Sequence, residues 1–540
     1  MRKSILSRFL ISNILWVLFT TCLIAALGLT RTFGTAYIND ITLQIEGRVF
    51  DRIGFYIFMA VFLQLWFYFI RWAIGVICWY LSEKLAYELR VKIISHLNKI
   101  PFIKYESLSV GDIQSLVRND TTAASNFIYA VLYKMIGNAS IFVAAGWYMA
   151  TIDVGGTIAV IVLSLFLGVV NHFINKRIRA YELESRNLLG QISSIAIKCL
   201  EMFDTIKLYV SSGFMLNKFA KSRDTYNDAI MGSVRLKAKS TVIMGITQHA
   251  LLLGTCILLG HRAIQRQDVS IGEMLVFIAL LNQVQIAVTT AFNYMSDLMS
   301  SYAAFDRIEE KLSIPVEDDT GVTVWDITKL DFENVSFSYN SEKKIIDNMH
   351  LSLEKGKLYK IAGESGSGKS TLLKILLGLY KSDVMDIVIN GERVDNLRLQ
   401  DVSTFVPSNP ELFNMSILEN LQMGEVAVSL ERCRTLAEEL GILAWIEALE
   451  DGFGYIISNS AGNLSGGQKQ LIAIARAILH DSQIIVLDEP FSALDEGMEK
   501  RLVNVLKKCR DRIIIFTSHR DSVIFEDDIF GVYTLATANH

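Results

Sequence analysis

The sequence predicts an all-α transmembrane domain of six helices with long cytoplasmic helical extensions, followed by an α/β domain built around a phosphate-binding loop. Long apolar stretches fill the first part of a 540-residue chain that is 51% hydrophobic and 20% charged. Short apolar segments then alternate with helical patterns, as in α/β domains. The glycine-rich stretch GESGSGKST lies between one such segment and a helix. We therefore assign residues 1–312 to the membrane domain, 313–329 to a linker and 330–540 to the α/β domain.

The apolar stretches are long enough to cross a bilayer as helices. A helix needs about 20 apolar residues to span the hydrocarbon core, and each stretch approaches or exceeds that length. Helices in a soluble core rarely stay apolar on all sides for so long. The first stretch is too long for a signal peptide and is followed by further spans. The six stretches are Phe9–Leu29, Ile53–Leu81, Phe127–Ala150, Ile158–Ile174, Val242–Ile264 and Met274–Met295.

The basic residues predict the orientation of these spans. Lysine and arginine gather before the first stretch, between the second and third, and between the fourth and fifth. Because cytoplasmic loops carry the excess of positive charge, we expect both chain ends and both long loops in the cytoplasm. Helical patterns continue through those loops, so we expect turns near residues 99–112 and 207–219. The formal net charge of −4 argues against a nucleic-acid partner, and six scattered cysteines indicate neither disulfides nor a metal cluster.

The second domain contains four strand-like runs, at residues 357–363, 386–391, 483–489 and 512–518. The last two are apolar at consecutive positions, which is typical of strands buried on both faces of a parallel sheet. A doubly covered parallel sheet is therefore expected there.

The first of these runs leads into a motif for binding nucleotide phosphates. GESGSGKST matches G-x-x-x-x-G-K-[ST] and stands between a strand and a helix, as the motif requires. Its glycines let backbone amides point at phosphate oxygens, Lys369 reaches the β- and γ-phosphates, and the Ser370 hydroxyl can bind Mg²⁺. The predicted ATP-binding residues of this loop are Gly363, Glu364, Ser365, Gly366, Ser367, Gly368, Lys369, Ser370 and Thr371.

Two later strand ends carry candidate catalytic residues. IIVLDEP ends in Asp488, suited to hold Mg²⁺, and Glu489, suited to polarise an attacking water. The alternative is that two acidic residues end a strand without any catalytic role. The phosphate loop in the same domain makes this alternative weaker. His519 follows IIIFTS and could reach a γ-phosphate from a neighbouring strand end. A lone histidine is more often structural, so its assignment depends on that position.

Taken together, these pieces resemble the ATP-binding-cassette family. The phosphate loop, NLSGGQ, VLDEP, SALD at 492–495 and TSHR with His519 occur in that family's order. The resemblance is close from about Leu330 to the end of the chain and looser over the six spans. It implies a half-transporter in which a membrane domain is fused to an ATP-hydrolysing domain, with ATP and Mg²⁺ as cofactors.

The resemblance also assigns residues that the motifs alone do not. Tyr339 in VSFSYN looks like the aromatic residue that stacks on adenine, with a core aromatic as the alternative. In the family, the signature helix of one cassette closes over ATP bound to a second cassette. This implies ATP contacts by Ser465, Gly466, Gly467 and Gln468, and a dimer with a second copy or with a related half-transporter.

At two points the sequence departs from the family pattern. VPSNPELF at 406–413 places Ser408 where relatives have a glutamine that contacts Mg²⁺ and the attacking water. Asn459, before the signature, stands where an acidic residue is common. Both segments face the cytoplasmic turns of the membrane domain in the family. We expect competent ATP chemistry with altered coupling to transport, while neutral drift explains the departures equally well.

Polar residues inside the spans are candidates for lining the transport pathway. Such residues usually face a cavity or another helix. LLNQVQ holds the densest group, and hydrogen bonding between helices is at least as good an explanation for any one member. Lys134 lies near enough to the cytoplasmic end to snorkel and receives less weight. The candidates are Gln64, Gln248, Asn282, Gln283 and Gln285.

The resemblance therefore implies ATP-driven export of a peptide or amphipathic small molecule by a dimer in the bilayer of a bacterial plasma membrane, with the nucleotide domain in the cytoplasm. A lipid flippase or a multidrug exporter is an alternative within the same family. A regulatory membrane protein that binds ATP without transport belongs to another class, and an intact Glu489 argues against it. An importer would usually keep the two domains on separate chains.

Overall fold

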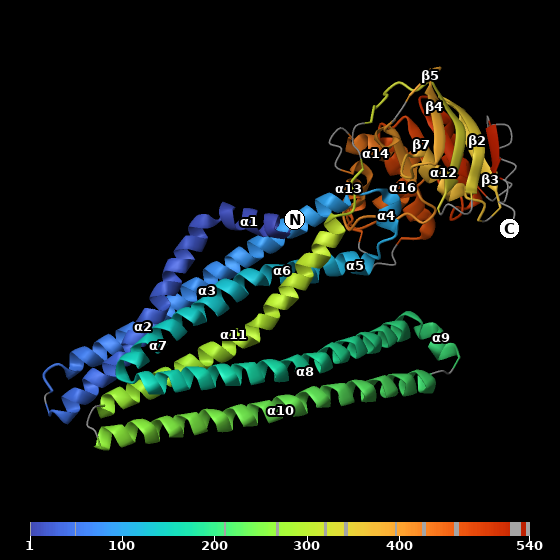
Figure 1. Cartoon of the computed structure of the whole chain (residues 1–540). Helices are drawn as coiled ribbons and strands as arrows, with labels where there is room; N and C mark the ends of the chain where they lie inside the picture. The colour runs from blue at the N-terminus through green and yellow to red at the C-terminus, as the bar shows by residue number, and fades with distance from the viewer. Residues whose placement is uncertain are drawn as a thin grey trace. The chain divides into compact units, whose positions relative to one another are not determined.

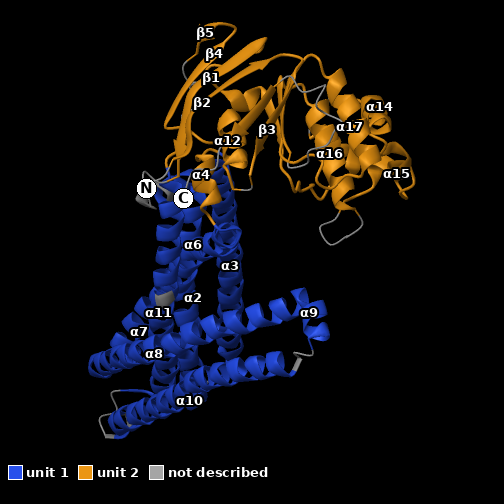
Figure 2. Ribbon diagram, turned by 90° about the vertical axis from the view of Figure 1, so that its right-hand side faces the viewer, with its two compact units in different colours: residues 1–98, 109–314 blue, residues 99–108, 315–540 orange. Residues whose placement is uncertain are grey.

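The structure is a computed structural model that describes residues 2–48, 50–209, 212–265, 269–317, 321–339, 344–364, 366–394, 397–423, 428–457, 464–518 and 531–535. The chain forms two compact units, coloured separately in Figure 2. Unit 1 comprises residues 1–98 and 109–314, and unit 2 comprises residues 99–108 and 315–540. A short segment from the turn after the second span thus packs with the α/β unit.

The elements that unit 1 forms in its described residues are all helices, and six helical segments among them are long and apolar enough to cross a membrane. They extend well beyond the apolar stretches: α10 has 54 residues, or about 80 Å at 1.5 Å per residue, against a hydrocarbon core of about 30 Å. The helices are α1 (Arg2–Ser12), α2 (Ile14–Glu46), α3 (Ile53–Leu97), α5 (Val110–Ser115), η1 (Leu116–Asp120), α6 (Thr121–Ile128), η2 (Tyr129–Ile136), α7 (Gly137–Ile152), α8 (Val154–Glu201), α9 (Phe203–Leu208), α10 (Ser212–Gln265) and α11 (Ile271–Leu312).

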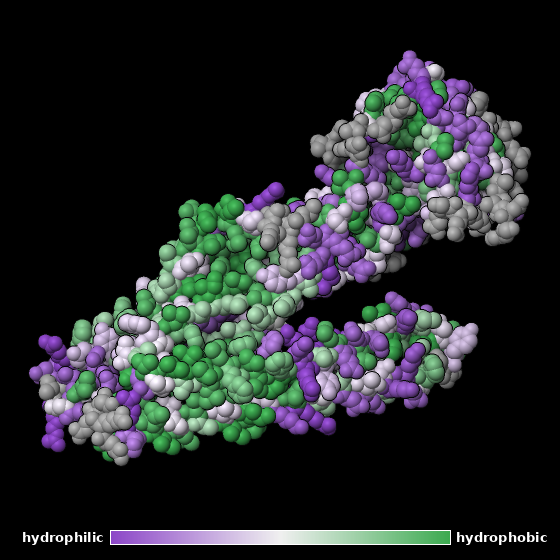
Figure 3. Space-filling model, viewed as in Figure 1, coloured by the Kyte–Doolittle hydropathy of each residue, from purple (hydrophilic) through white to green (hydrophobic). Residues whose placement is uncertain are grey.

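Unit 1 presents apolar side chains outward, as a membrane domain must. Phe58, Phe62, Trp66 and Phe69 form a stacked series along an exposed face of α3. Figure 3 shows hydrophobic side chains gathered over much of unit 1, whereas hydrophilic ones gather on the parts of α8 and α10 nearest α9. The polar parts of α8 and α10 explain why these helices are longer than the apolar stretches, because the helices continue beyond the hydrocarbon layer. Figure 1 shows α8 and α10 side by side, joined through α9.

Close packing fixes α2 against α7. A Cβ added at Gly28 of α2 would lie 2.3 Å from the Ser140 carbonyl oxygen of α7, so only glycine permits this approach. Small residues at such crossings let helix backbones meet where no hydrophobic effect drives association. On α11, Phe277, Leu280 and Leu281 are fully buried, which makes that helix central to the bundle.

Unit 2 contains two sheets. The four-stranded sheet has the order β2-β1-β4-β5, with all pairs antiparallel, and the five-stranded sheet has the order β6-β7-β8-β3-β9, with all pairs parallel. Their strands are β1 (Lys329–Ser338), β2 (Lys344–Glu354), β3 (Leu358–Gly363), β4 (Val384–Ile389), β5 (Glu392–Arg393), β6 (Ser403–Val406), β7 (Ile484–Leu487), β8 (Ile513–Thr517) and β9 (Gly531–Leu535).

The helices of unit 2 cover the parallel sheet. Every residue of β7 and β8 is buried, which confirms the expectation drawn from their unbroken apolar runs. The helices are α4 (Phe102–Glu106), α12 (Lys369–Leu376), η3 (Leu399–Asp401), α13 (Ile417–Gln422), α14 (Leu430–Glu439), α15 (Leu443–Glu447), η4 (Gly452–Gly454), α16 (Gly466–Leu479) and α17 (Glu496–Lys508). Because the five strands are parallel, their carboxyl ends share one edge, where ligands of such sheets bind.

Candidate functional site

The phosphate loop joins β3 to α12 at the carboxyl edge of the parallel sheet. Gly366 and Gly368 have φ angles of 82° and 96°, in the left-handed region that side chains disfavour. A Cβ at Gly368 would also lie 2.8 Å from the Ile345 side chain. The loop therefore depends on these glycines, and α12 begins at Lys369, where the first amides of a helix have no partner within the helix.

Lys369 is buried within the loop. Its ammonium group donates hydrogen bonds to the carbonyl oxygens of Gly363 and Glu364, each at 2.8 Å. Burial lowers the pKa of Lys369, while the carboxylates of Glu489 and Asp488 act in the opposite direction. A cation held by backbone carbonyls can turn to a phosphate without breaking an ion pair first.

Asp488 lies directly beyond β7 and receives hydrogen bonds from two hydroxyl groups. Ser370 donates to Oδ2 at 3.0 Å, and Thr517, at the end of β8, donates to Oδ1 at 2.7 Å. Asp488 is 9% exposed and Thr517 is fully buried. The carboxylate and the Ser370 hydroxyl thus form a pair of oxygen donors next to the phosphate loop, which fits the preference of Mg²⁺ for oxygen ligands.

Glu489 is held by its backbone. Its φ angle is 49°, which is uncommon for a residue with a side chain, and its N–H donates to Thr517 Oγ1 at 2.8 Å. One buried hydroxyl therefore orients both Asp488 and Glu489. Sequence reasoning overlooked Thr517; the signal was a threonine that ends an unbroken apolar strand.

Tyr339 lies just after β1, half-exposed, and belongs to an aromatic cluster. Its ring packs edge-on against Phe337 and Tyr380, with centroids 5.1 and 5.8 Å away, and its hydroxyl hydrogen-bonds Thr371 Oγ1 at 3.0 Å. The cluster holds one edge of the ring and leaves part of the side chain accessible beside the start of α12. That position is compatible with stacking on a base.

The signature segment caps α16. Ser465 accepts a hydrogen bond from the Gln468 N–H at 3.2 Å, and the Gln468 side chain accepts one from the Ser465 N–H at 2.8 Å. This capping box stabilises the helix end while the following amide of exposed Gly466 stays at the surface. Gly467 is buried, and a Cβ there would lie 2.7 Å from the Ala493 carbonyl oxygen. Gly467 thus lets the SALD segment approach the helix end.

Two family descriptions match the chain and decide its identity. The ABC transporter transmembrane region matches residues 8–288, and the ABC transporter description matches residues 346–492. The chain belongs to the ABC transporter family. Because it joins one membrane region to one ATP-binding domain, it is an exporter half-transporter and a multi-pass membrane protein.

Similar proteins support this assignment. A protein of Haemophilus influenzae named a probable ABC transporter ATP-binding/permease protein is 28% identical, covering 84% of this chain and 83% of its own. The ATP-dependent lipid A-core flippase of Hahella chejuensis is 26% identical over 83% of this chain and 78% of the flippase. The lactococcin-A transport/processing ATP-binding protein of Lactococcus lactis is 27% identical, covering 82% and 62%. The solved structure of a bacterial Atm1-family ABC exporter with ATP bound has a TM-score of 0.77 at 19% identity, and the match covers 99% of this chain and 94% of that one.

In this ABC half-transporter, Ser408 is exposed two residues beyond β6, beside the Asp488 strand end. The Asp488 N–H donates to the Val406 carbonyl at 2.8 Å, which places the start of that segment next to the acidic pair. Three of the predicted positions, Ser365, Asn459 and His519, lie outside the described residues.

The predicted pathway residues of the transporter do not form one group. Gln283 is buried and donates to Thr35 Oγ1 on α2 at 3.0 Å, whereas exposed Gln248 donates to Asn282 at 3.3 Å. Gln285 is buried, and Gln64 lies beside Gly34 between α2 and α3. Part of the set therefore forms hydrogen bonds between helices, and none of the five lines the polar cavity described below.

The short helix α4 of the transporter packs on α12 within unit 2. Glu106 accepts hydrogen bonds from Lys374, at 2.7 Å, and from the Tyr380 hydroxyl. The Phe102 ring lies 6.2 Å from that of Tyr380. Tyr380 also packs against Tyr339, so contacts run from α4 to the aromatic residue beside the phosphate loop.

This contact should respond to acid. Burial raises the pKa of Glu106, but the hydrogen bonds from Lys374 and Tyr380 outweigh it and lower the pKa overall. A carboxyl with a lowered pKa stabilises the contact above its ordinary pKa of about 4.3, and that contribution is lost as pH falls through the lowered value. We expect a spin label at Lys104→Cys to be immobilised at pH 7, and to be released only in acid below that ordinary range.

Adding Glu106→Gln should release the label already at pH 7, because the charge-assisted bonds are gone. Glu450→Gln, a change at an exposed carboxylate of the same unit, should leave it immobilised. Equal mobility in all three proteins at neutral pH would contradict the role of Glu106.

Proposed function

We propose that the chain is an ATP-driven exporter of a peptide or amphipathic small molecule. The observation that carries the proposal is the joining of Lys369, Asp488 and Glu489 at one sheet edge in a chain that also has six candidate membrane spans. A protein that only binds ATP would need the phosphate loop alone. Glu489, beyond the end of β7, adds a carboxylate that can polarise water. This supports turnover over a purely regulatory ATP switch.

In this proposal each residue has a defined role. Amides of the loop and Lys369 bind the triphosphate, and Tyr339 contacts the base. Ser370 and Asp488 would hold Mg²⁺, which neutralises charge on the β- and γ-phosphates when bound. Glu489 orients and polarises the attacking water, and Thr517 holds the Asp488 carboxylate and the Glu489 backbone. His519 remains a proposed γ-phosphate contact.

The reconstituted transporter provides the direct test. We expect vanadate-sensitive ATP hydrolysis in liposomes that increases with at least one compound from a panel of peptides, lipids and dyes, together with ATP-dependent movement of that compound. ATP binding without hydrolysis, and without transport of any panel member, would favour the regulatory alternative. The relatives named for lipid A-core and for lactococcin make a lipid and a peptide suitable first panel members.

We further propose that two copies share each ATP site. The amide of exposed Gly466 lies at the start of α16, where it can bind a phosphate, and the phosphate loop of the same chain already binds the triphosphate of its own ATP. The phosphate at Gly466 would therefore belong to ATP bound by the second copy. Ser465→Arg should disable the signature, and Lys369→Ala should disable the phosphate loop. A mixture of these two inactive chains restores one composite site in each mixed dimer. We expect single-turnover phosphate release from the mixture above that of either variant alone.

The pairwise controls make this result specific. Ser465→Arg mixed with itself should stay inactive, as should a chain carrying both changes mixed with itself. Phosphate release from the mixture no greater than from the separate variants would contradict a site shared between copies.

Ser408 provides a test of coupling. Glutamine is longer than serine by about two bonds and could reach the acidic pair without a bridging water. We expect Ser408→Gln to alter the ratio between ATP hydrolysis with and without a stimulating compound from the panel. Asn409→Gln, at the exposed neighbouring position, is the matched control. Unchanged rates under both conditions would refute a coupling role and favour neutral drift.

A further inference from the structure

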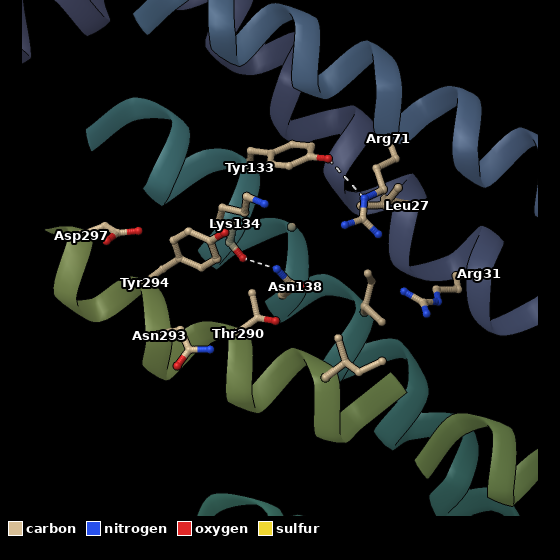
Figure 4. Close-up of a pocket in the computed structure, with 13 residues that line it drawn as sticks. Leu27, Arg31, Arg71, Tyr133, Lys134, Asn138, Thr290, Asn293, Tyr294 and Asp297 are labelled. Atoms are coloured by element: carbon tan, nitrogen blue, oxygen red, sulfur yellow. Dashed lines mark hydrogen bonds between the residues drawn. The ribbon is translucent and has the colours of Figure 1, made fainter. Parts of the chain in front are cut away.

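A polar cavity lies inside the helical bundle of unit 1. It has a volume of about 430 Å³, within the size range of small-molecule sites. Figure 4 shows its polar side chains coming from α2, α3, η2, α7 and α11. The lining residues that matter most are Arg31, Arg71, Tyr133, Lys134, Tyr294 and Asp297.

The cavity has an excess of positive charge. Arg31, Arg71 and Lys134 are half-buried in its wall, whereas its one carboxylate, Asp297, is an exposed residue at its edge. Within the described part of the chain, no carboxylate oxygen lies within 4.0 Å of these three cations. Other arginines of the unit do have such partners.

Two of those arginines show the contrast. Arg262 pairs with Asp153 at 2.5 Å, and Arg307 pairs with Asp120, also at 2.5 Å. Pairing is the rule for charges inside membrane domains because an isolated charge there is costly. Three neighbouring cations without an acidic partner therefore indicate that the missing negative charge comes from outside the chain.

The depth of the cations adds to this cost. At 1.5 Å per residue, Arg71 lies about 27 Å along α3 from Ile53, inside the apolar stretch Ile53–Leu81. Arg31 lies two residues beyond the end of the stretch Phe9–Leu29. Arg71 thus lies at a depth where the side chains of a span are normally apolar, and Arg31 lies at the border of its apolar stretch.

Aromatic rings hold the cations in place. The Arg31 guanidinium lies 5.0 Å from the Phe67 ring centroid, and Arg71 donates to the Tyr133 hydroxyl at 3.2 Å. The Lys134 ammonium lies 5.0 Å from the ring centroids of both Tyr133 and Tyr294. Such contacts orient a cation without neutralising it, so its charge remains available to an anion.

The backbone around Lys134 is also unusual. Tyr133 and Lys134 belong to η2, an eight-residue π-helical stretch between α6 and α7. π-Helical turns inside α-helices are rare and frequently mark functional sites. Here the wide turn places both side chains on the cavity wall.

We propose that this cavity binds the anionic group of the transported molecule, a carboxylate or a phosphate, and that the cargo is therefore an anionic amphiphile. Arg31 and Arg71 would bind its oxygens with their planar donor groups, and Lys134 would add a third charge. Leu27, Ile141 and Ile286 form apolar parts of the wall that suit the adjoining hydrocarbon. The cargo assignment rests on the proposed export function, whereas the anion site does not.

The test uses the full-length protein in phosphatidylcholine nanodiscs and three twelve-carbon amphiphiles: dodecyl phosphate, dodecanoate and dodecyltrimethylammonium. We expect calorimetric titration to show binding of the two anionic probes and none of the cationic one. Arg31→Gln and Arg71→Gln should each raise the dissociation constant of dodecyl phosphate at least about tenfold. Lys92→Gln, which removes an exposed cation from the same helix as Arg71, should leave it unchanged.

Further arms separate folding and the source of the anion. Arg71→Lys keeps the positive charge, so it should lose less affinity for dodecyl phosphate than Arg71→Gln does. If the loss came from misfolding, keeping the charge would not restore affinity. If phosphatidylglycerol in the nanodisc displaces dodecyl phosphate at equal affinity, the site belongs to bilayer lipid and the cargo assignment fails. Equal binding of all three probes, or no effect of either arginine, overturns the anion site.

ATP hydrolysis in the same nanodiscs distinguishes this inference from the proposed function. The anionic probes should increase the ATP turnover of the wild type but not that of Arg71→Gln. Normal basal turnover without anion binding would refute only the cavity proposal. Anion binding without any ATP turnover would refute the proposed function and the cargo assignment that rests on it, but not the anion site.

Discussion

Glu489→Gln should reduce ATP turnover by a factor of about 10² to 10⁴, the contribution typical of a positioned general base, while ATP binding persists. The amide has nearly the shape of the carboxylate, so the backbone turn at φ 49° and the hydrogen bond from the Glu489 N–H to Thr517 are retained. What is lost is the basicity that polarises the attacking water. Phosphate release and the affinity for a fluorescent ATP analogue measure the two effects separately.

Glu450→Gln is the matched control for this experiment, because it makes the same chemical change at an exposed position of unit 2. It should leave turnover and affinity at the wild-type level. Turnover in Glu489→Gln within a factor of two of wild type would show that another group activates the water. A loss of ATP affinity as large as the loss of turnover would show instead that Glu489 acts in binding.

Lys369→Ala should weaken ATP binding about 10- to 100-fold, and turnover should become undetectable at ATP concentrations that saturate the wild type. A hydrogen bond to a charged group contributes about 1.5–3 kcal/mol, and Lys369 has no substitute within the described phosphate loop. Removing the ammonium group also leaves the carbonyl oxygens of Gly363 and Glu364 without the donor they face. Equilibrium titration with the fluorescent ATP analogue measures the change in affinity.

Lys381→Ala removes an exposed lysine that follows α12 and should leave affinity unchanged. A similar loss in both variants would point to general electrostatic attraction rather than to the specific position of Lys369. Retention of wild-type affinity by Lys369→Ala would contradict the assignment of the loop.

The sequence was informative about local elements of the fold. Apolar runs predicted the six spans and the buried strands β7 and β8, because burial on all sides leaves a continuous pattern. It was silent about which strands are neighbours. β3 carries the phosphate loop and β7 carries Asp488, yet β8 lies between them and places Thr517 against the acidic pair. In the antiparallel sheet β1 and β2 are consecutive in the chain, but the pairing of β1 with β4 joins distant segments and had no local signal.

The membrane cavity could not be predicted from the same patterns. The sequence pattern pointed to amide side chains as the polar residues that would line the pathway. Gln283, however, forms a hydrogen bond to α2 and does not line the cavity. Arg31 and Arg71 belong to separate helices, and only the rotation of α2 and α3 about their axes brings both to one wall. Lys134 was given little weight because its depth suggested an interfacial position. Its aromatic neighbours come from η2 and α11, which lie far apart in sequence.

The crossing of α2 and α7 at Gly28 constrains how this transporter can move. With backbone nearly touching backbone, the two helices cannot slide past each other or rotate independently without a collision at Ser140. They should move together as one rigid pair, which carries Arg31 and Asn138 with it. Any change in the width of the polar cavity then requires α3 and α11, which also line it, to move relative to this pair.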